Sequence, residues 1–205
     1  VSWLQIDEPV LALELTSDWQ QAFQTSYRHL QKGRLKLLLT SYFGDIQAYL
    51  PQLAELPFDG VHLDFCADTT EVAAALAQTE TLVPAHWVFS AGIINGRNIW
   101  RADLAALFAP LQAIKAKRGQ LLWLGTSCSL LHCPVDLTLE KQFDAETYLW
   151  FAFARQKCTE LQLLQQALHS ANHQALVSYS APILQRQLSN RVHNPRVLQA
   201  CQIAK

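Results

Sequence analysis

The chain has 205 residues, half of them hydrophobic, and a formal net charge of −1, so it is long enough to bury a sizeable core as one domain. Its lysines and arginines are scattered, which argues against a nucleic-acid partner because phosphate backbones require a basic stripe. No apolar run approaches the ~20 residues that span a bilayer, and the N-terminus has no signal-peptide pattern. We therefore expect a cytoplasmic protein without a membrane partner.

Five apolar segments end in polar residues, and each is predicted to be a buried strand. Helical stretches separate these segments, so the pattern indicates an α/β fold with a parallel sheet. Polar residues at the carboxyl ends of such strands are typical of a TIM-type (β/α)8 barrel, whose site lies at that rim. The five segments are residues 3–9, 35–41, 61–64, 87–90 and 121–128.

The first helix is predicted from the spacing of Ser17 and Gln20, which matches a capping box, to Gly33. One face of this helix is expected to pack on the sheet through Trp19, Phe23, Tyr27 and Leu30. A short helix follows at residues 47–53. The capping spacing is repeated at Asp68 and Glu71, ahead of an alanine-rich helix.

The later helices are interrupted by prolines. Pro110 is expected to kink or split the helix that begins near Leu104, and Gly119 to end it. Asp144 to Ser170 is predicted to be the longest helix, roughly 40 Å in length, projecting past the barrel. The tail, residues 171–205, is predicted to form one or two short helices broken at Pro182 and Pro195.

A complete barrel of this type has eight strands and typically ~250 residues, whereas only five strand–helix units are visible here. The chain also opens one residue from a strand and contains no methionine. We therefore expect a partial barrel of about five parallel strands, with its first strands missing. A trimmed chain and a compact five-stranded domain are the alternatives. Because five strands cannot close a barrel, we expect the open edges to pair with another copy or to be covered by the tail.

Two acids end the first strand. Asp7 and Glu8 are adjacent, so their side chains point to opposite sides of the strand and cannot form an acid/base pair alone. A glycosidase would need a second carboxylate at about 5 to 10 Å, and Asp64 is the candidate. Alternatively, one carboxylate pairs with an arginine or caps a helix.

A cysteine- and histidine-rich loop follows the fifth strand. Cys128, His132 and Cys133 are residue types that bind zinc, with His62 or Asp64 as a possible fourth ligand, but their spacing does not match a closed structural site. The alternative is that small residues pack a turn here. Five cysteines at irregular spacings argue against a disulfide framework and favour reduced thiols.

Arg97 lies in a loop bounded by two glycines, beside Asn98, and a guanidinium there offers paired donors to a carboxylate or phosphate. The alternative is a salt bridge to a carboxylate of the rim. The candidate substrate-binding residues are Asp7, Glu8, Arg97 and Asn98. A polar cluster near the end is expected to fix the exit of the tail; it comprises Ser189, Arg191, His193, Asn194 and Pro195.

Five motifs in order resemble the amino-terminal half of cobalamin-independent methionine synthase. The resemblance covers essentially the whole chain, and the motifs are residues 5–9 (QIDEP), 39–43 (LTSYF), 96–100 (GRNIW), 127–132 (SCSLLH) and 191–194 (RVHN). It implies two similar barrels face to face and transfer of a methyl group from 5-methyltetrahydropteroyl-polyglutamate to homocysteine. It further implies that residues 1–205 are about strands four to eight of the amino-terminal barrel, with residues 144–205 as its helical end and exit segment.

The resemblance places the catalytic zinc in the carboxy-terminal barrel, and implies no cofactor here. The positions that match a His-x-Cys pair of zinc ligands are Leu39 and Ser41, which leaves only Asp64 and Cys128 as residual ligand positions. The position of the proton-transfer histidine falls near Arg97. Contacts to the folate tail are expected mostly from a segment before Val1.

Two hypotheses follow. In the first, the chain is an inactive scaffold segment of the methyltransferase, with no catalytic residue. Its partners are the carboxy-terminal catalytic barrel and the missing first strands, and its open sheet edges allow self-association. In the second, it is an independent barrel hydrolase or decarboxylase that uses Asp7, Glu8, Asp64 and Arg97.

Overall fold

The computed structural model describes residues 1–66, 71–170 and 172–203. They form an α/β fold around one parallel sheet with strand order β1-β2-β3-β4-β5. The strands are β1 (Trp3–Asp7), β2 (Lys36–Thr40), β3 (Gly60–Asp64), β4 (Val88–Ile94) and β5 (Leu122–Thr126). Each strand lies beside its neighbours in sequence, as in a barrel, whereas an open doubly wound sheet reverses its order. The expected partial barrel of five parallel strands is confirmed.

The register of the strands carries the geometry of a barrel. In-register neighbours link Trp123 through Ser90, His62 and Thr40 to Asp7. In a TIM-type barrel, the line that runs perpendicular to the strands moves back by one residue at each strand. Four strand steps separate β5 from β1, so the β1 residue at the height of Trp123 is Trp3, four residues before Asp7. The two indole rings meet edge to face at 5.0 Å.

Alternate strands fill the inside of such a barrel in layers. Trp3, Gly60 and Trp123 form one layer on β1, β3 and β5, and Gln5, His62 and Gly125 form the next. A Cβ on Gly125 would lie 2.9 Å from Cε1 of His62, so the imidazole occupies the space that a side chain would need. The concave face is therefore packed as the inside of a barrel.

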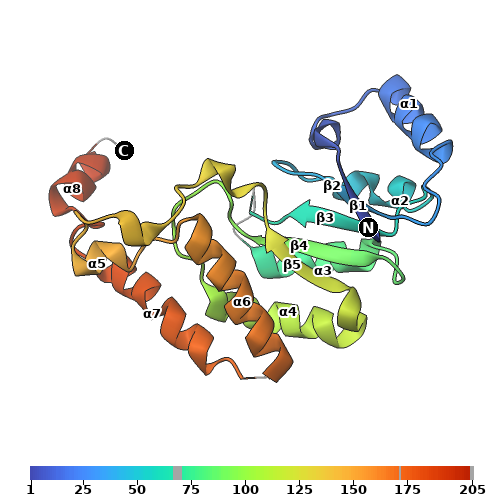
Figure 1. The fold of residues 1–205 in the computed structure, drawn as a ribbon. Helices are drawn as coiled ribbons and strands as arrows, with labels where there is room; N and C mark the ends of the chain where they lie inside the picture. The colour runs from blue at the N-terminus through green and yellow to red at the C-terminus, as the bar shows by residue number, and fades with distance from the viewer. Residues whose placement is uncertain (67–70, 171, 204–205) are drawn as a thin grey trace.

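Helices cover the outer face of the sheet (Figure 1). They are α1 (Ser17–Arg28), α2 (Leu50–Leu53), α3 (Val72–Leu82), α4 (Leu104–Arg118) and α6 (Ala154–Ser170). A further helix, α7 (Gln174–Leu188), packs against α4 and α6. Short 3-10 turns lie at Pro9–Ala12, Gln47–Tyr49, Gly119–Leu121, Leu130–His132 and Leu137–Leu139. The core lies between these helices and the outward-facing strand residues, including Leu37, Leu39, Val61, Leu63 and Phe89.

The predicted first helix was wrong in its ends and in part of its face. Thr16 caps it by accepting from the backbone N–H of Trp19, so the cap lies one residue before Ser17, and the helix ends at Arg28. Phe23 and Tyr27 pack against the core as expected. Trp19, in the first turn of the helix, is 63% exposed instead of packed on the sheet. The predicted cap at Asp68 falls outside the described residues.

The long helix predicted from Asp144 to Ser170 is interrupted. It consists of α5 (Ala145–Tyr148) and α6, separated by residues 149–153. Phe151 forms an antiparallel bridge with Trp100, and Ala152 donates to the carbonyl of Ile99 at 2.8 Å. Burial of Trp150, Phe151 and Phe153 with Leu137 in a second apolar cluster stabilises the extended segment. The sequence predicted one helix there because apolar residues recur at helical spacing across the interruption; they are Leu149, Phe153, Leu161, Leu164 and Leu168.

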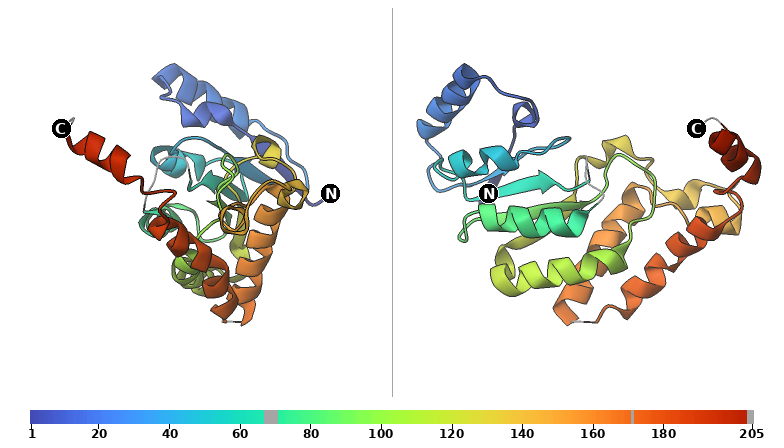
Figure 2. Two further views of the ribbon diagram at one scale, coloured as in Figure 1. Left: turned by 90° about the vertical axis from the view of Figure 1, so that its left-hand side faces the viewer. Right: turned by 180° about the vertical axis from the view of Figure 1, so that it is seen from behind.

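The prolines affect the helices less than expected. Pro110 lies inside α4 without splitting it, and Pro182 lies inside α7, which continues to Leu188. A proline removes one helical hydrogen bond, but apolar neighbours of Pro110 and Pro182 itself are buried, which offsets that loss. Gly119, with φ +56°, ends α4 as predicted. α8 (Pro195–Ile203) begins at Pro195 and stands away from the sheet (Figure 2).

Candidate functional site

The rim formed by the carboxyl ends of the strands separates Asp7 from Glu8, as predicted. Asp7 faces the concave side, where its carboxylate accepts from Nε2 of Gln5 at 2.7 Å and from the Tyr42 hydroxyl at 3.3 Å. Burial, together with Asp7, raises the pKa of Tyr42 to about 12. Glu8 faces outward and accepts from the hydroxyl of Tyr27 on α1. The two acids therefore have separate roles: Asp7 belongs to the concave face, and Glu8 connects α1 to the sheet through Tyr27.

A buried polar network lies below the rim and was not recognised from the sequence. His62 is 8% exposed, and its Nδ1 lies 2.8 Å from the Ser90 hydroxyl. Its ring meets that of Tyr42 edge to face at 5.9 Å. Burial lowers the pKa of His62, although nearby backbone oxygens and the carboxylates of Asp64 and Asp7 oppose that shift. The alternation of side chains along each strand could have revealed this network. Asp7, His62 and Ser90 occupy in-register positions, so their side chains lie on the same face of the sheet.

The residual zinc positions do not fit a metal site. Leu39 packs in the core on the helix side of the sheet, away from the concave face. Asp64 is already used by the backbone, since its two oxygens accept from the N–H groups of Phe43 at 3.1 Å and Cys66 at 2.7 Å. Burial raises the pKa of Cys128, so a zinc ion at this position would have to displace the proton of the thiol. Zinc prefers deprotonated thiolates in a tetrahedral set.

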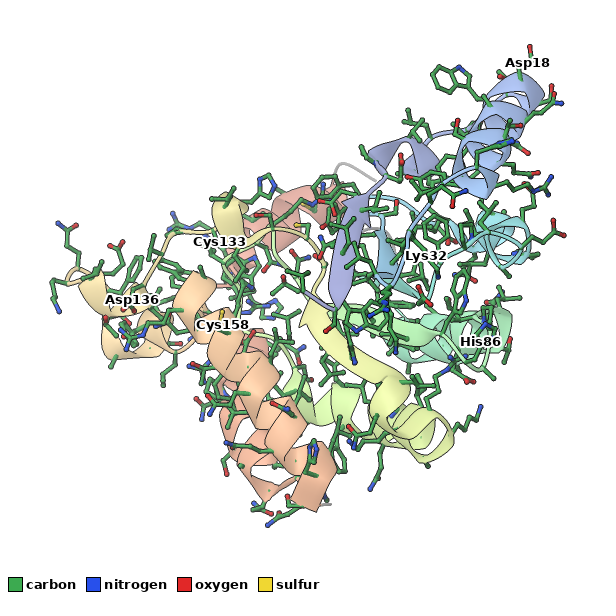
Figure 3. All side chains as sticks on the ribbon, turned by 45° about the vertical axis from the view of Figure 1, so that its right-hand side comes forward. Asp18, Lys32, His86, Cys133, Asp136 and Cys158 are labelled. Atoms are coloured by element: carbon green, nitrogen blue, oxygen red, sulfur yellow. The ribbon has the colours of Figure 1, made fainter. Side chains whose placement is uncertain are left out.

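The cysteine loop is built as a packed turn. Sγ of Cys133 lies 3.0 and 3.1 Å from the carbonyl oxygens of Gly96 and Asn98, where a thiol donates and a thiolate would be repelled. Burial raises the pKa of Cys133. Within the described ranges, no group of three or more His, Cys, Asp or Glu residues could hold a metal ion. All five cysteines are free. Figure 3 shows Cys133 in the loop that follows β5 and Cys158 on α6.

Arg97 is exposed at the rim, and its guanidinium lies over the ring of Phe43, 4.6 Å from the centroid. The predicted alternative of a salt bridge to Asp7, Glu8 or Asp64 is not formed among the described residues. Because no ion pair is formed, the planar donors of Arg97 are available to an anion.

Asn98, the other loop candidate, has a structural role. Its Oδ1 accepts from the backbone N–H of Trp100 at 3.1 Å and from Nζ of Lys157 at 3.3 Å. Lys157 and Glu160 are both fully buried on α6, and burial lowers the pKa of the first and raises that of the second. Glu160 accepts from the N–H of Ala102 at 2.9 Å. This pair holds the loop that carries Arg97.

Lys157 and Glu160 could have been found from the sequence. They lie at helical spacing on the face that also contains the buried Phe153 and Leu164. Charged residues within an apolar stripe indicate buried and partnered charges.

The polar cluster near the end connects α7 to α5. Arg191 Nη1 lies 2.6 Å from Asp144, and Nε lies 3.5 Å from Glu146. The Ser189 hydroxyl donates to Glu146 at 2.8 Å. These contacts follow the expectation that the cluster fixes the exit of the tail.

The fold and the rim define a segment of a parallel α/β barrel, with a polar mouth at the carboxyl ends of its strands. A family model described as "Cobalamin-independent synthase, N-terminal domain" matches residues 1–119. The chain therefore belongs to the cobalamin-independent synthase family, as its motifs indicated. No helix within the described ranges is both long and apolar enough to cross a membrane.

The relatives are named 5-methyltetrahydropteroyltriglutamate–homocysteine methyltransferase. The chain is 50% identical over 202 residues to that of Vibrio cholerae, which covers 96% of this chain and 26% of the relative. It is 49% identical over 200 residues to that of Aeromonas salmonicida, with the same coverage. The chain thus spans about a quarter of the length of the curated relatives it matches.

Proposed function

We propose that this chain is a segment of a methyltransferase that makes methionine by moving a methyl group from 5-methyltetrahydropteroyl-polyglutamate to homocysteine. The observation that carries the proposal is 50% identity over nearly the whole chain to a relative with that printed activity. Residues 1–205 would be about strands four to eight of the amino-terminal barrel, and residues 144–205 its helical end. The cytoplasm is the expected compartment.

Within that enzyme the segment acts as a scaffold without a catalytic residue. Leu39 and Asp64 support this role, because the first packs on the helix side of the sheet and the second accepts from two backbone N–H groups. Cys128 by itself does not make a tetrahedral zinc site. The zinc of the reaction then belongs to a carboxy-terminal barrel, which is the proposed partner together with the first strands of this barrel. The separation of Asp7 from Glu8 weighs against an independent hydrolase or decarboxylase.

The test uses the polypeptide as the cell makes it, purified and assayed for methionine formation and zinc content. Asp64→Asn and Cys128→Ser remove the two residual ligand positions, and Cys158→Ser on α6 is the matched control. We expect methyl transfer and stoichiometric zinc in all four proteins, because the metal ligands lie outside residues 1–205. Loss of zinc in either rim variant, but not in the control, would contradict the proposal.

A further inference from the structure

Three loops bring a cation and two rings together at the rim, and we name Phe43, Arg97 and His132 the Arg97 platform. Phe43 follows β2, Arg97 follows β4 and His132 follows β5. The guanidinium lies 4.6 Å from the centroid of the Phe43 ring, and the His132 ring meets the same ring edge to face at 5.9 Å. All three residues are exposed.

The backbone at Phe43 is held in an unfavourable conformation to display this ring. Among the described residues other than glycine, Phe43 alone has a positive φ, of 70°, and a bulky side chain rarely adopts this conformation. Asp64 stabilises the conformation by accepting from the N–H of Phe43 at 3.1 Å. The ring remains 43% exposed. Strain that exposes an apolar ring beneath a cation is typical of a binding surface.

Nearby carboxylates are engaged with other partners. Asp7 accepts from Gln5 and Tyr42, and Asp64 accepts from two backbone N–H groups. Glu8 lies on the other face of the sheet, at Tyr27. The Phe43 ring lies against the guanidinium, and no side chain among residues 1–66, 71–170 and 172–203 forms a hydrogen bond or ion pair with its N–H groups, so paired hydrogen bonds to a ligand can form there.

We propose that the Arg97 platform is a receptor for a carboxylate that comes from outside residues 1–205. One guanidinium matches the two oxygens of a carboxylate in a paired geometry. A phosphate dianion would need several fixed donors, and Asp7 and Asp64 make this rim unfavourable for a second negative charge. A carboxylate gains the paired contact at a lower electrostatic cost.

Binding of a carboxylate at the Arg97 platform is argued from the structure alone. The two sources of that carboxylate rest on the proposed function. One source is a glutamyl substrate, and the other is an aspartate or glutamate elsewhere in the same polypeptide. The recognition chemistry is identical, so the experiment has to separate them. Its readout is chemical modification of one side chain, which is independent of methyl transfer.

The first arm measures how fast an arginine-selective dicarbonyl reagent modifies Arg97 in the native polypeptide, by mass spectrometry of its peptides. Arg34 is the internal control, because it is exposed and has no ion pair within the described residues. Reactions are run without additive, with a triglutamate peptide, and with inorganic phosphate at equal ionic strength. Selective protection of Arg97 by the peptide, at least about tenfold over phosphate, identifies a ligand carboxylate.

The second arm uses Arg97→Lys and a carbodiimide that joins an amine directly to a contacting carboxylate. If Arg97 is protected without additive, we expect the introduced lysine to cross-link to an aspartate or glutamate outside residues 1–205. Arg34→Lys is the matched control. Equal modification of Arg97 and Arg34 in every reaction, or equal protection by the peptide and by phosphate, would overturn the inference. Protection of Arg97 without additive would overturn it too if the introduced lysine formed no such cross-link, or cross-linked only to Asp7, Glu8 or Asp64. None of these results depends on whether the polypeptide transfers methyl groups.

Discussion

At the scale of single residues, the rim contrasts a buried imidazole with an exposed guanidinium. His62 fits beneath the rim because Gly92 and Gly125 leave space for its ring; a Cβ on Gly92 would lie 3.0 Å from its Nε2. Burial lowers the pKa of His62, and its Nδ1 lies 2.8 Å from the Ser90 hydroxyl. Arg97 keeps its charge in solvent over an aromatic ring. Burial therefore decides which of these two basic residues can meet an anion.

His62 predicts a pH dependence of stability. Burial holds the pKa of His62 below its ordinary value of 6.5, so the unfolded chain binds a proton that the folded chain does not. Stability is thus complete above the ordinary pKa and falls as pH drops through it, by at most about 1.4 kcal/mol per pH unit for one group. Chemical unfolding from pH 7.5 to 5.5 measures this loss. The difference in slope between His62→Gln and the wild type isolates this residue, with the exposed His29→Gln as control; equal slopes would show that His62 is not responsible.

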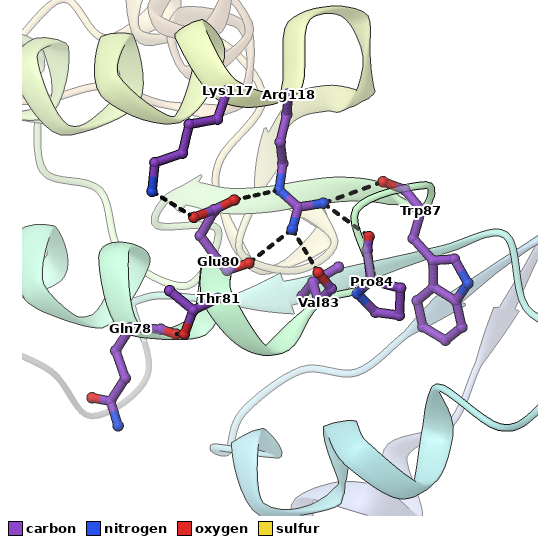
Figure 4. Close-up of polar contacts among 8 residues, drawn as sticks. All are labelled: Gln78, Glu80, Thr81, Val83, Pro84, Trp87, Lys117 and Arg118. Carbon is purple, nitrogen blue, oxygen red and sulfur yellow. Dashed lines mark hydrogen bonds and ion pairs between the residues drawn. The ribbon is translucent and has the colours of Figure 1, made fainter.

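At the scale of elements, a buried ion pair connects α3 to α4 and to the start of β4 (Figure 4). Arg118 Nε lies 3.0 Å from Glu80 Oε1, and its other nitrogens donate to the carbonyls of Glu80, Val83, Pro84 and Trp87. Burial raises the pKa of Glu80, but donation from Lys117 and Arg118 outweighs it and holds that pKa below its ordinary value. The guanidinium thereby satisfies carbonyls that the end of α3 leaves without helical partners.

Removing this guanidinium should be costly. Arg118→Met is expected to destabilise the fold by about 3 to 5 kcal/mol, because it leaves a buried carboxylate without its main partner. Lys117→Met removes an ammonium that is 62% exposed at the same carboxylate and should cost less than about 1 kcal/mol. Urea unfolding of both variants measures the difference. Similar losses for the two would show that the inner contacts contribute little.

At the scale of the whole molecule, the five described strands curve as a barrel but leave two edges. Trp3 and Trp123 meet across the concave face, yet β1 and β5 are not hydrogen-bonded to each other. α8 stands away from β1 (Figures 1 and 2), so the described tail does not cover that edge. Leu4 lies on this edge strand and is 46% exposed. An uncovered apolar edge is a surface for strand pairing.

Residues 1–205 studied alone are therefore expected to self-associate through β1. Light scattering over a concentration series should show a mass above 23.1 kDa. Leu4→Lys should weaken that association, because a charge on an edge strand opposes pairing. Leu188→Lys, at an 83% exposed site on α7, is the control. A monomer at all concentrations would contradict the expectation.

The sequence by itself determined the strands with polar ends, the division of Asp7 from Glu8 and the family, because alternation and motif order are local properties of the chain. Tertiary structure decided the rest. Residues 149–153 leave the helix because Trp150 and Phe151 are buried in a cluster with Leu137 and Ile99, which lie earlier in the sequence. Pro182 stays within a helix because it is buried. Whether Arg97 forms an ion pair with Asp7, Glu8 or Asp64 depends on which donors those carboxylates find, and only packing in three dimensions sets those distances.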